Sequence, residues 1–177
     1  MREIVYYVAS SLDGFISGPN GDISGFVQGG AGVSKYLSDL QLFDTVIMGR
    51  NTYEFGYKFG LVPGQRAYPN MDHYIFSNSM KIENVVEGVH VCEPNLDTIR
   101  GLKSGTGSPI YLCGGGEFAG WLLENELIDI LKIKLNPLIL GDGVKMFGLS
   151  RKQYQLKLLE SEQYEGGLQI ITYKVEY

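Results

Sequence analysis

The chain has 177 residues, enough for one domain with a full core and too few for two, so we expect a single domain over residues 1–177. Its 44% hydrophobic and 20% charged residues are ordinary for a globular protein and exclude a disordered or collagen-like chain. The formal net charge of −5, without any run of Lys or Arg, argues against a nucleic-acid-binding protein.

The cysteines and histidines give no sign of a metal site. Cys92 and Cys113 lie in apolar, strand-like segments, where a buried reduced thiol is expected. His73 and His90 are far from any Cys-x-x-Cys spacing, so we expect no bound metal. The amino terminus lacks a long apolar stretch and no segment reaches the length of a membrane span, which predicts a cytoplasmic protein without a membrane partner.

The first third of the chain predicts a buried strand, a loop, a helix and a second strand. Residues 4–10 are almost continuously apolar, which indicates a buried strand, and a Gly-rich loop follows to about residue 32. Residues 33–43 carry apolar side chains every three or four positions, as in a helix with one face on a core. The predicted core face consists of Val33, Tyr36, Leu37, Leu40 and Phe43. Residues 44–48 form the next strand, and another helix begins near Gly49.

The rest of the chain alternates strands and helices and then ends in a hairpin. We expect, in order, strands at 73–77 and 85–92, a short helix at 96–102, a strand at 110–113, a helix at 117–125 and a strand at 128–135. Such alternation predicts a mostly parallel sheet. Residues 153–161 and 168–177, joined through 165–167, alternate like an antiparallel hairpin. The predicted fold class is therefore α/β, with a C-terminal antiparallel hairpin.

Three consecutive glycines between a strand and a helix are the most informative motif. Gly114, Gly115 and Gly116 let a backbone approach an oxyanion, and the helix that starts at Glu117 offers free N–H groups. The acidic residue that a Rossmann site needs about 20 residues later is missing, because Asn136 stands there. We interpret the motif as a phosphate loop and not a standard NAD site; the alternative is a tight turn without a ligand.

Two further motifs fall at predicted strand ends, where open α/β sheets bind ligands. The run Gly49-Arg50-Asn51-Thr52 offers an Arg fork and a hydroxyl to a phosphate, unless Arg50 only forms a surface ion pair and Thr52 only caps a helix. Ser77 and Asn78 could add donors to the same anion or form a simple polar turn.

Asp13 follows the first strand and precedes a glycine. A carboxyl group there is placed to face a ligand and could relay a proton, which makes Asp13 our candidate catalytic residue. The alternative is a turn residue that binds its own backbone.

Four segments, taken in order, carry a family resemblance: residues 8–16, 46–54, 110–116 and 137–147. With them the chain resembles the dihydrofolate reductase superfamily over nearly its whole length. It is most similar to the reductase domain of the bifunctional riboflavin-biosynthesis deaminase/reductase and to small stand-alone relatives of that domain. The resemblance implies a dihydrofolate reductase-like three-layer fold.

The resemblance also implies NADPH as the cofactor. Gly114, Gly115, Gly116 and Glu117 would surround the pyrophosphate, and Ala9 would border the nicotinamide. Arg50 and Thr52, within Gly49-Arg50-Asn51-Thr52, would hold the ribose 2′-phosphate and neighbouring phosphates with Ser77 and Asn78. The missing ribose-binding acid fits this assignment, because a carboxylate would repel a 2′-phosphate that Arg attracts.

The chain departs from dihydrofolate reductases at the acid of the first helix, where Val33 stands. In the riboflavin branch Asp13 would face the substrate, as proton relay or as binding residue. We therefore expect an NADPH-dependent oxidoreductase that transfers a hydride to a C=N or C=O carbon of a small heterocycle such as 5-amino-6-(5-phosphoribosylamino)uracil. The alternatives are a dihydrofolate reductase with a relocated acid and a non-catalytic nucleotide-binding protein of the same fold. The C-terminal hairpin predicts a homodimer.

Overall fold

The computed structural model describes all residues from Met1 to Tyr177. Its strands are β1 (Ile4–Ser10), β2 (Phe15–Ser17), β3 (Thr45–Gly49), β4 (Asp72–Phe76), β5 (Val89–Cys92), β6 (Ile110–Gly114), β7 (Ile130–Leu135), β8 (Val144–Lys145), β9 (Gln155–Gln163) and β10 (Gln169–Glu176). Its α-helices are α1 (Ala31–Leu40), α2 (Arg50–Phe55), α3 (Leu96–Ser104) and α4 (Gly116–Glu124). Short 3₁₀ turns span Pro19–Gly21, Gly56–Phe59 and Glu165–Gly167. No helix combines the length and the apolar character that a bilayer crossing requires.

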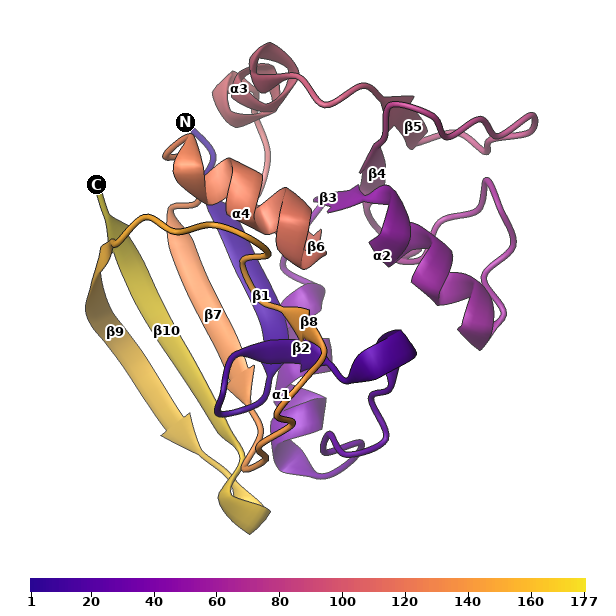
Figure 1. Cartoon of the computed structure of the whole chain (residues 1–177). Helices are drawn as coiled ribbons and strands as arrows, with labels where there is room; N and C mark the ends of the chain where they lie inside the picture. Colours follow the sequence, from indigo (N-terminus) through magenta and orange to yellow (C-terminus); the bar gives the residue numbers. More distant parts are fainter.

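Eight strands form one sheet in the order β5-β4-β3-β6-β1-β7-β10-β9 (Figure 1). The first six of these run parallel, whereas β10 is antiparallel to β7 and β9 is antiparallel to β10. This confirms the mostly parallel sheet with a C-terminal antiparallel hairpin. A small antiparallel pair, β2 with β8, was not expected, because two strands of three and two residues leave no periodic signal.

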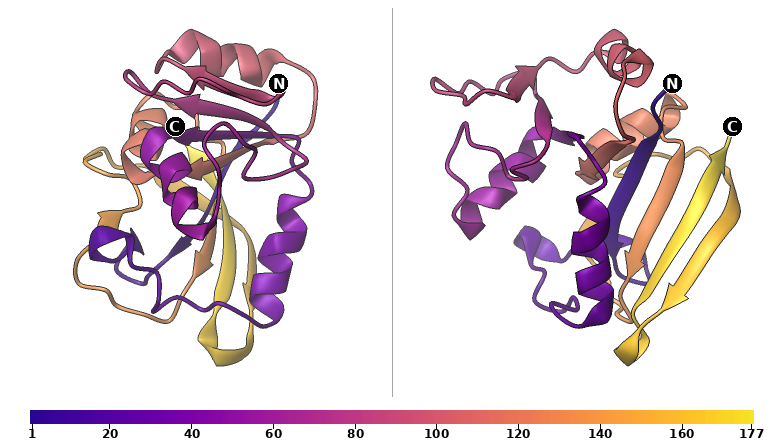
Figure 2. Two further views of the ribbon diagram at one scale, coloured as in Figure 1. Left: turned by 90° about the vertical axis from the view of Figure 1, so that its right-hand side faces the viewer. Right: turned by 180° about the vertical axis from the view of Figure 1, so that it is seen from behind.

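Helices cover both faces of the sheet and make three layers. Tyr7 and Val5 of β1 pack with Leu40 of α1 and Tyr53 of α2 on one face. On the other face, Tyr6 and its neighbours in β1 pack with the residues of α3 and α4, among them Ile99 and Leu122. Figure 2 shows α1 and α4 on opposite sides of the sheet. Both faces of β1 are buried, which explains its continuous apolar sequence.

Helix α1 differs from its prediction in position and in buried face. It begins at Ala31 and ends at Leu40, and Leu37 is 55% exposed. Asp39 is buried instead, because its carboxylate accepts hydrogen bonds from Lys35, from Lys132 on β7 and from the Tyr7 hydroxyl. Burial raises the pKa of Asp39, but the hydrogen bonds from the two lysines outweigh it and the pKa lies below its ordinary value. The spacing of apolar residues along the sequence cannot reveal a helix face that is buried through ion pairs.

Several predicted strands have different limits, and the strand expected at 128–135 begins at Ile130. The strand expected at 85–92 is confined to Val89–Cys92, because the chain turns at Gly88 with a φ of 77°. The first strand of the hairpin is Gln155–Gln163, two residues later than expected. Its side chains are mostly exposed at the sheet edge, and a homodimer through this hairpin stays a prediction.

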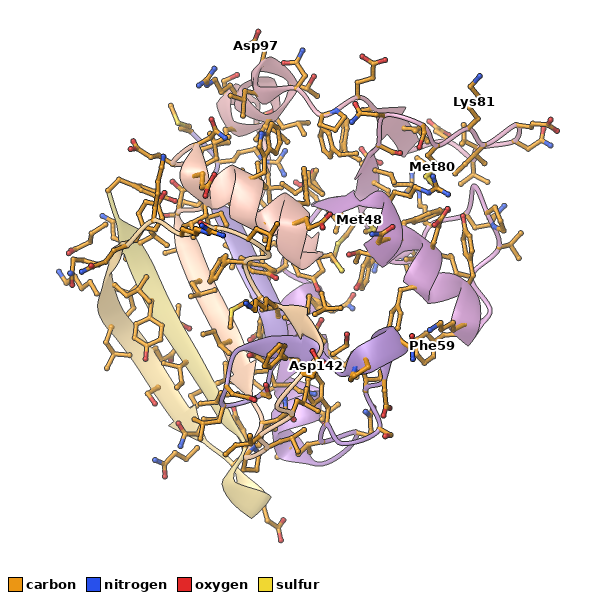
Figure 3. The ribbon with its side chains drawn as sticks, in the orientation of Figure 1. Met48, Phe59, Met80, Lys81, Asp97 and Asp142 are labelled. Carbon is orange, nitrogen blue, oxygen red and sulfur yellow. The ribbon has the colours of Figure 1, made fainter.

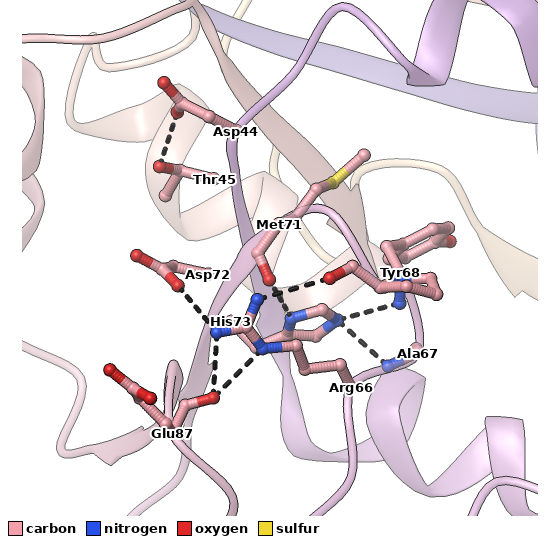
Figure 4. Close-up of polar contacts among 10 residues, drawn as sticks. Asp44, Thr45, Arg66, Ala67, Tyr68, Met71, Asp72, His73 and Glu87 are labelled. Atoms are coloured by element: carbon pink, nitrogen blue, oxygen red, sulfur yellow. Dashed lines mark hydrogen bonds and ion pairs between the residues drawn. The ribbon is translucent and has the colours of Figure 1, made fainter.

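His73 has a structural role (Figure 4). Its Nε2 accepts the backbone N–H groups of Ala67 and Tyr68, at 3.1 and 3.2 Å, and its Nδ1 lies 3.0 Å from the Met71 carbonyl oxygen. These partners assign the proton to Nδ1. Burial lowers the pKa of His73, which keeps the ring neutral and the loop before β4 attached. No group of three or more His, Cys, Asp or Glu side chains is arranged to hold a metal ion.

We expect Asp39→Asn to destabilise the fold by about 3 kcal/mol, because it leaves Lys132 desolvated beside a neutral amide. Urea denaturation measures this free energy of unfolding. The exposed pair of Asp97 and Arg100 on α3 is the control, and Asp97→Asn should cost less than about 1 kcal/mol. Equal effects of the two substitutions would contradict a stabilising role of the buried network.

Candidate functional site

The predicted site segments meet at one edge of the sheet. Strands β4, β3, β6 and β1 are consecutive neighbours, and their parallel direction brings their carboxyl ends together. The segments that follow them are Ser77-Asn78, Gly49-Arg50-Asn51-Thr52, Gly114-Gly115-Gly116 and Ser11–Asp13. This is the edge at which open α/β sheets bind ligands.

The three glycines have two different roles. A Cβ on Gly116 would overlap the carbonyl oxygen of Lys145, so Gly116 lets α4 pack against the chain beyond β8. A Cβ on Gly115 would meet only the Thr52 hydroxyl oxygen, 3.0 Å away. Gly114 has a φ of 128° and is joined to Gly115 by a cis peptide. Gly114 and Gly115 therefore present backbone that a ligand can approach, whereas the side-chain position of Gly116 is taken by the protein itself.

Helix α4 begins with no side-chain cap. Gly115 is its N-cap residue, and the first helical hydrogen bond runs from the Ala119 N–H to the Gly115 carbonyl. The N–H groups of the first turn, including that of Glu117, precede this bond. With the helix dipole they favour an anion at the glycine loop.

Thr52 and Gly49 support this loop from α2. Gly49 is the N-cap residue of α2 and no side chain caps that helix, so Thr52 is not the cap that the alternative proposed. Its hydroxyl oxygen instead lies next to Gly115. Gly49 packs against Phe118, whose Cβ would be 3.3 Å from a Cβ at that position. Asn51 is exposed.

Arg50 forms both an ion pair and part of a pocket wall. Its Nε donates to Glu54 at 2.8 Å and its Nη1 donates to Ser79 at 3.1 Å, which leaves Nη2 without a partner. The surrounding pocket has a volume of about 560 Å³. It is lined by Arg50, Glu54, Tyr57, Pro63 and residues 79–84, and Figure 3 marks Met80 and Lys81 on this last segment. Arg50 and Lys81 can attract an anion here, whereas Glu54, which binds the guanidinium, and Glu83 oppose it.

Ser77 and Asn78 lie differently in the turn after β4. The Ser77 hydroxyl accepts the N–H groups of Ser79 and Met80, so it closes the turn, and Asn78 is exposed. Ser79 is the hydroxyl that reaches Arg50. Lys81 also lines the pocket, and its only signal in the sequence is a single cation a few residues after a predicted strand end.

Asp13 is bound by the loop after β7. Its carboxylate accepts the Ser11 hydroxyl at 2.6 Å, the Gly141 N–H at 2.7 Å and the Leu140 N–H at 3.1 Å. The bond from Ser11, followed by those from the backbone, lowers the pKa of Asp13 to about 2. The carboxyl group is therefore ionised at neutral pH, which favours positioning or binding over proton donation.

Ala9 lies on β1 directly opposite Lys134 of β7, on the sheet face that α1 covers. It is half-buried at the end of the strand, next to the neighbouring glycine loop of β6.

Residues 2–170 match the family described as "RibD C-terminal domain". The chain belongs to this family. It is 30% identical to the uncharacterized protein YwjB of Bacillus subtilis (strain 168), over 96% of each chain. The fold is similar to a putative riboflavin biosynthesis protein from Shewanella sp. PV-4, with a TM-score of 0.82 and 25% identity over the whole of both chains. It is also similar to dihydrofolate reductase from Enterococcus faecalis complexed with NADP(H), with a TM-score of 0.69 and 14% identity over 99% of this chain and 97% of that one.

Membership of the RibD C-terminal domain family confirms the suspected superfamily and the dihydrofolate reductase-like fold. The roles of the individual site residues rest on the geometry described above.

We expect acid to remove a contribution of Asp13 to stability. The folded pKa of about 2 lies below the ordinary value of 3.8, so the stabilisation is complete above pH 4 and is lost as pH falls from about 4 to about 2. Thermal unfolding of Asp13→Asn, compared with the parent protein across this range, measures the effect. The difference in Tm should shrink towards pH 2; a constant difference would contradict the assignment.

The two roles of the glycines predict opposite outcomes for two similar substitutions. Gly116→Ala should destabilise the fold by about 2 kcal/mol, because the new methyl group overlaps the backbone at Lys145. Gly115→Ala should cost less, because its methyl group meets only the Thr52 hydroxyl. Denaturant unfolding measures both, and the reverse order of stability would refute the distinction.

Proposed function

We propose that this protein is an NADPH-dependent reductase. The observation that carries the proposal is the common edge at which Gly114 and Gly115, the uncapped start of α4, Thr52 and Arg50 come together. Backbone N–H groups and a free guanidinium nitrogen suit the pyrophosphate and the 2′-phosphate of that cofactor. The complex of the similar Enterococcus faecalis enzyme with NADP(H) supports this choice.

In the proposed complex the glycine loop and the α4 N-terminus hold the pyrophosphate. Arg50, Ser79 and Lys81 bind the 2′-phosphate in the pocket beside α2, where the fork of Arg50 exchanges part of its bond to Glu54 for the phosphate. Ala9 leaves room for the nicotinamide at the end of β1. The bound cofactor supplies the hydride, and the protein orients it against the substrate.

We propose as substrate a small heterocycle with a reducible C=N or C=O carbon, for which 5-amino-6-(5-phosphoribosylamino)uracil is the first candidate. The name of the family and of the similar Shewanella protein supports a compound of riboflavin biosynthesis. A folate reductase with a relocated acid is less well supported. Such an acid would have to help protonate the folate. Asp39 is the buried carboxylate of α1, but its two lysine partners keep it ionised, so it does not suit that role.

One observation favours a second candidate, a nucleotide-binding protein without catalysis. Asp13 lines neither the pocket beside α2 nor a second pocket of about 220 Å³ next to the start of α1. Stopped-flow absorbance at the NADPH band, with the pyrimidine substrate present, separates the two candidates. Oxidation of NADPH supports the reductase, whereas binding of NADPH without oxidation of it by any tested heterocycle supports the second candidate.

For the cofactor we expect Arg50→Ala to weaken NADPH binding about tenfold or more, because a charge-assisted hydrogen bond to the 2′-phosphate is lost. NADH lacks that phosphate, so its affinity should be nearly unchanged. Fluorescence titration gives both dissociation constants. Arg100→Ala on α3 is a matched control, since Arg100 is exposed and contacts only Asp97. Equal affinities of the parent protein for NADPH and NADH would refute the 2′-phosphate assignment.

A further inference from the structure

Lys134 is a buried cation without a carboxylate. It is 7% exposed and forms no ion pair. Lys132, two residues earlier on the same strand face, and Lys35 on α1 both pair with Asp39. Buried lysines are normally paired, because removing a charge from water is costly. Lys35 also lies 3.8 Å from Glu162 on β9, so two carboxylates face the two paired lysines, and Lys134 is the buried lysine of this side of the sheet that pairs with no carboxylate.

The ammonium of Lys134 has unused hydrogen-bonding capacity. Its only acceptor is the Val27 carbonyl oxygen, 3.0 Å from Nζ, and the Tyr36 ring lies 5.7 Å away on α1. Since an ammonium has three N–H donors, Lys134 can donate to a ligand as well as to Val27. Burial also lowers the pKa of Lys134. Both properties suit a group that binds or protonates a ligand.

The position of Lys134 brings it to the candidate site. It pairs with Ala9 across β1 and β7, and paired residues of parallel strands point to the same side of the sheet. That side also carries Tyr7 and Cys113, and it is the side that α1 covers. The ammonium therefore lies on the face of Ala9, and only β1 separates its strand from β6 and the glycine loop.

Other ionisable groups near this face do not suit proton donation. Asp13 and Asp39 are ionised acceptors, as described above. The hydroxyls of Tyr36 and Tyr111 bind each other at 2.9 Å, and burial raises the pKa of both. Burial also raises the pKa of the Cys113 thiol, which lies 3.4 Å from the Tyr68 hydroxyl. Lys132 already donates to Asp39.

We propose that Lys134 is a catalytic residue that donates the proton in the reduction. This inference rests on the proposed function. When the hydride adds to the carbon of the C=N or C=O group, the π electron pair moves to the nitrogen or oxygen. Lys134 transfers a proton from Nζ to that atom, an N–H or O–H bond forms, and the neutral amine takes a proton from water. The expected substrates are then those in which the nitrogen or oxygen that takes up the electron pair is uncharged, so that a cation of the protein must supply its proton.

The first experiment uses the cofactor alone. An oxidised nicotinamide ring carries a positive charge that the reduced ring lacks, so a nearby ammonium disfavours NADP⁺ relative to NADPH. In Lys134→Met we expect the ratio of the dissociation constants of NADP⁺ and NADPH to fall about three- to tenfold. Lys134→Arg keeps the charge and should keep the ratio, which also guards against a folding defect. Lys174→Met, at an exposed position of β10, is the control for the change in net charge.

The second experiment measures turnover of 5-amino-6-(5-phosphoribosylamino)uracil. Lys134→Met should lower kcat about 100-fold or more with a smaller change in KM, and Lys134→Arg should restore part of kcat. A parent protein that binds neither form of the cofactor would refute the proposed function. Cofactor binding with an unchanged ratio in Lys134→Met would refute the inference alone, as would an unchanged kcat. If the parent protein binds NADPH but does not reduce this pyrimidine, the inference is tested by the ratio of the NADP⁺ and NADPH dissociation constants in Lys134→Met.

Discussion

The fold depends on the central position of β1. This strand pairs with β6 along one edge and with β7 along the other, and helices bury both of its faces. Its end is therefore fixed in direction, and the segment from Ala9 to Asp13 leaves the sheet between two parallel neighbours. The glycine loop of β6 and Lys134 of β7 are placed on either side of that exit. The loops at this edge therefore start from strand ends whose positions the sheet fixes.

The chain after β7 closes the site from the outside. Asp13 holds it through the N–H groups of Leu140 and Gly141, and the Met146 carbonyl accepts the Tyr6 hydroxyl. The same chain then packs its backbone against α4, where Gly116 leaves no side chain in the way. These contacts join the end of β1 to the start of α4. Asp13, our candidate catalytic residue, thus also positions a connection that packs against the start of α4.

Periodic burial and strand-end motifs made most of the fold and the edge of the site predictable. The continuous apolar run of β1 and the strand–glycine–helix order at Gly114 carried enough signal. Asp39 and Lys134 could not be predicted, because each is buried by contacts with residues that are distant in sequence. The same applies to Ser79, which bonds Arg50, and to Lys81, which lines the same pocket. Sequence patterns locate backbone elements, whereas ion pairs and pocket walls arise from the tertiary structure.

The order of these groups along the edge constrains the ligand. From the end of β4, beside the Arg50 pocket, to the end of β1 there are three strand spacings, or about 14 Å. Anion-attracting groups occur at the outer end of this span and again at the glycine loop of β6, before the end of β1. A compact phosphate ester would reach only one of them. A ligand that uses both must be extended, with phosphates at an end and near its middle, and it must leave its far ring beside Ala9 and Lys134. A dinucleotide with a 2′-phosphate, such as the NADPH that we propose, has this order of charges, and Lys134 then lies at the end of the span that is away from the phosphates.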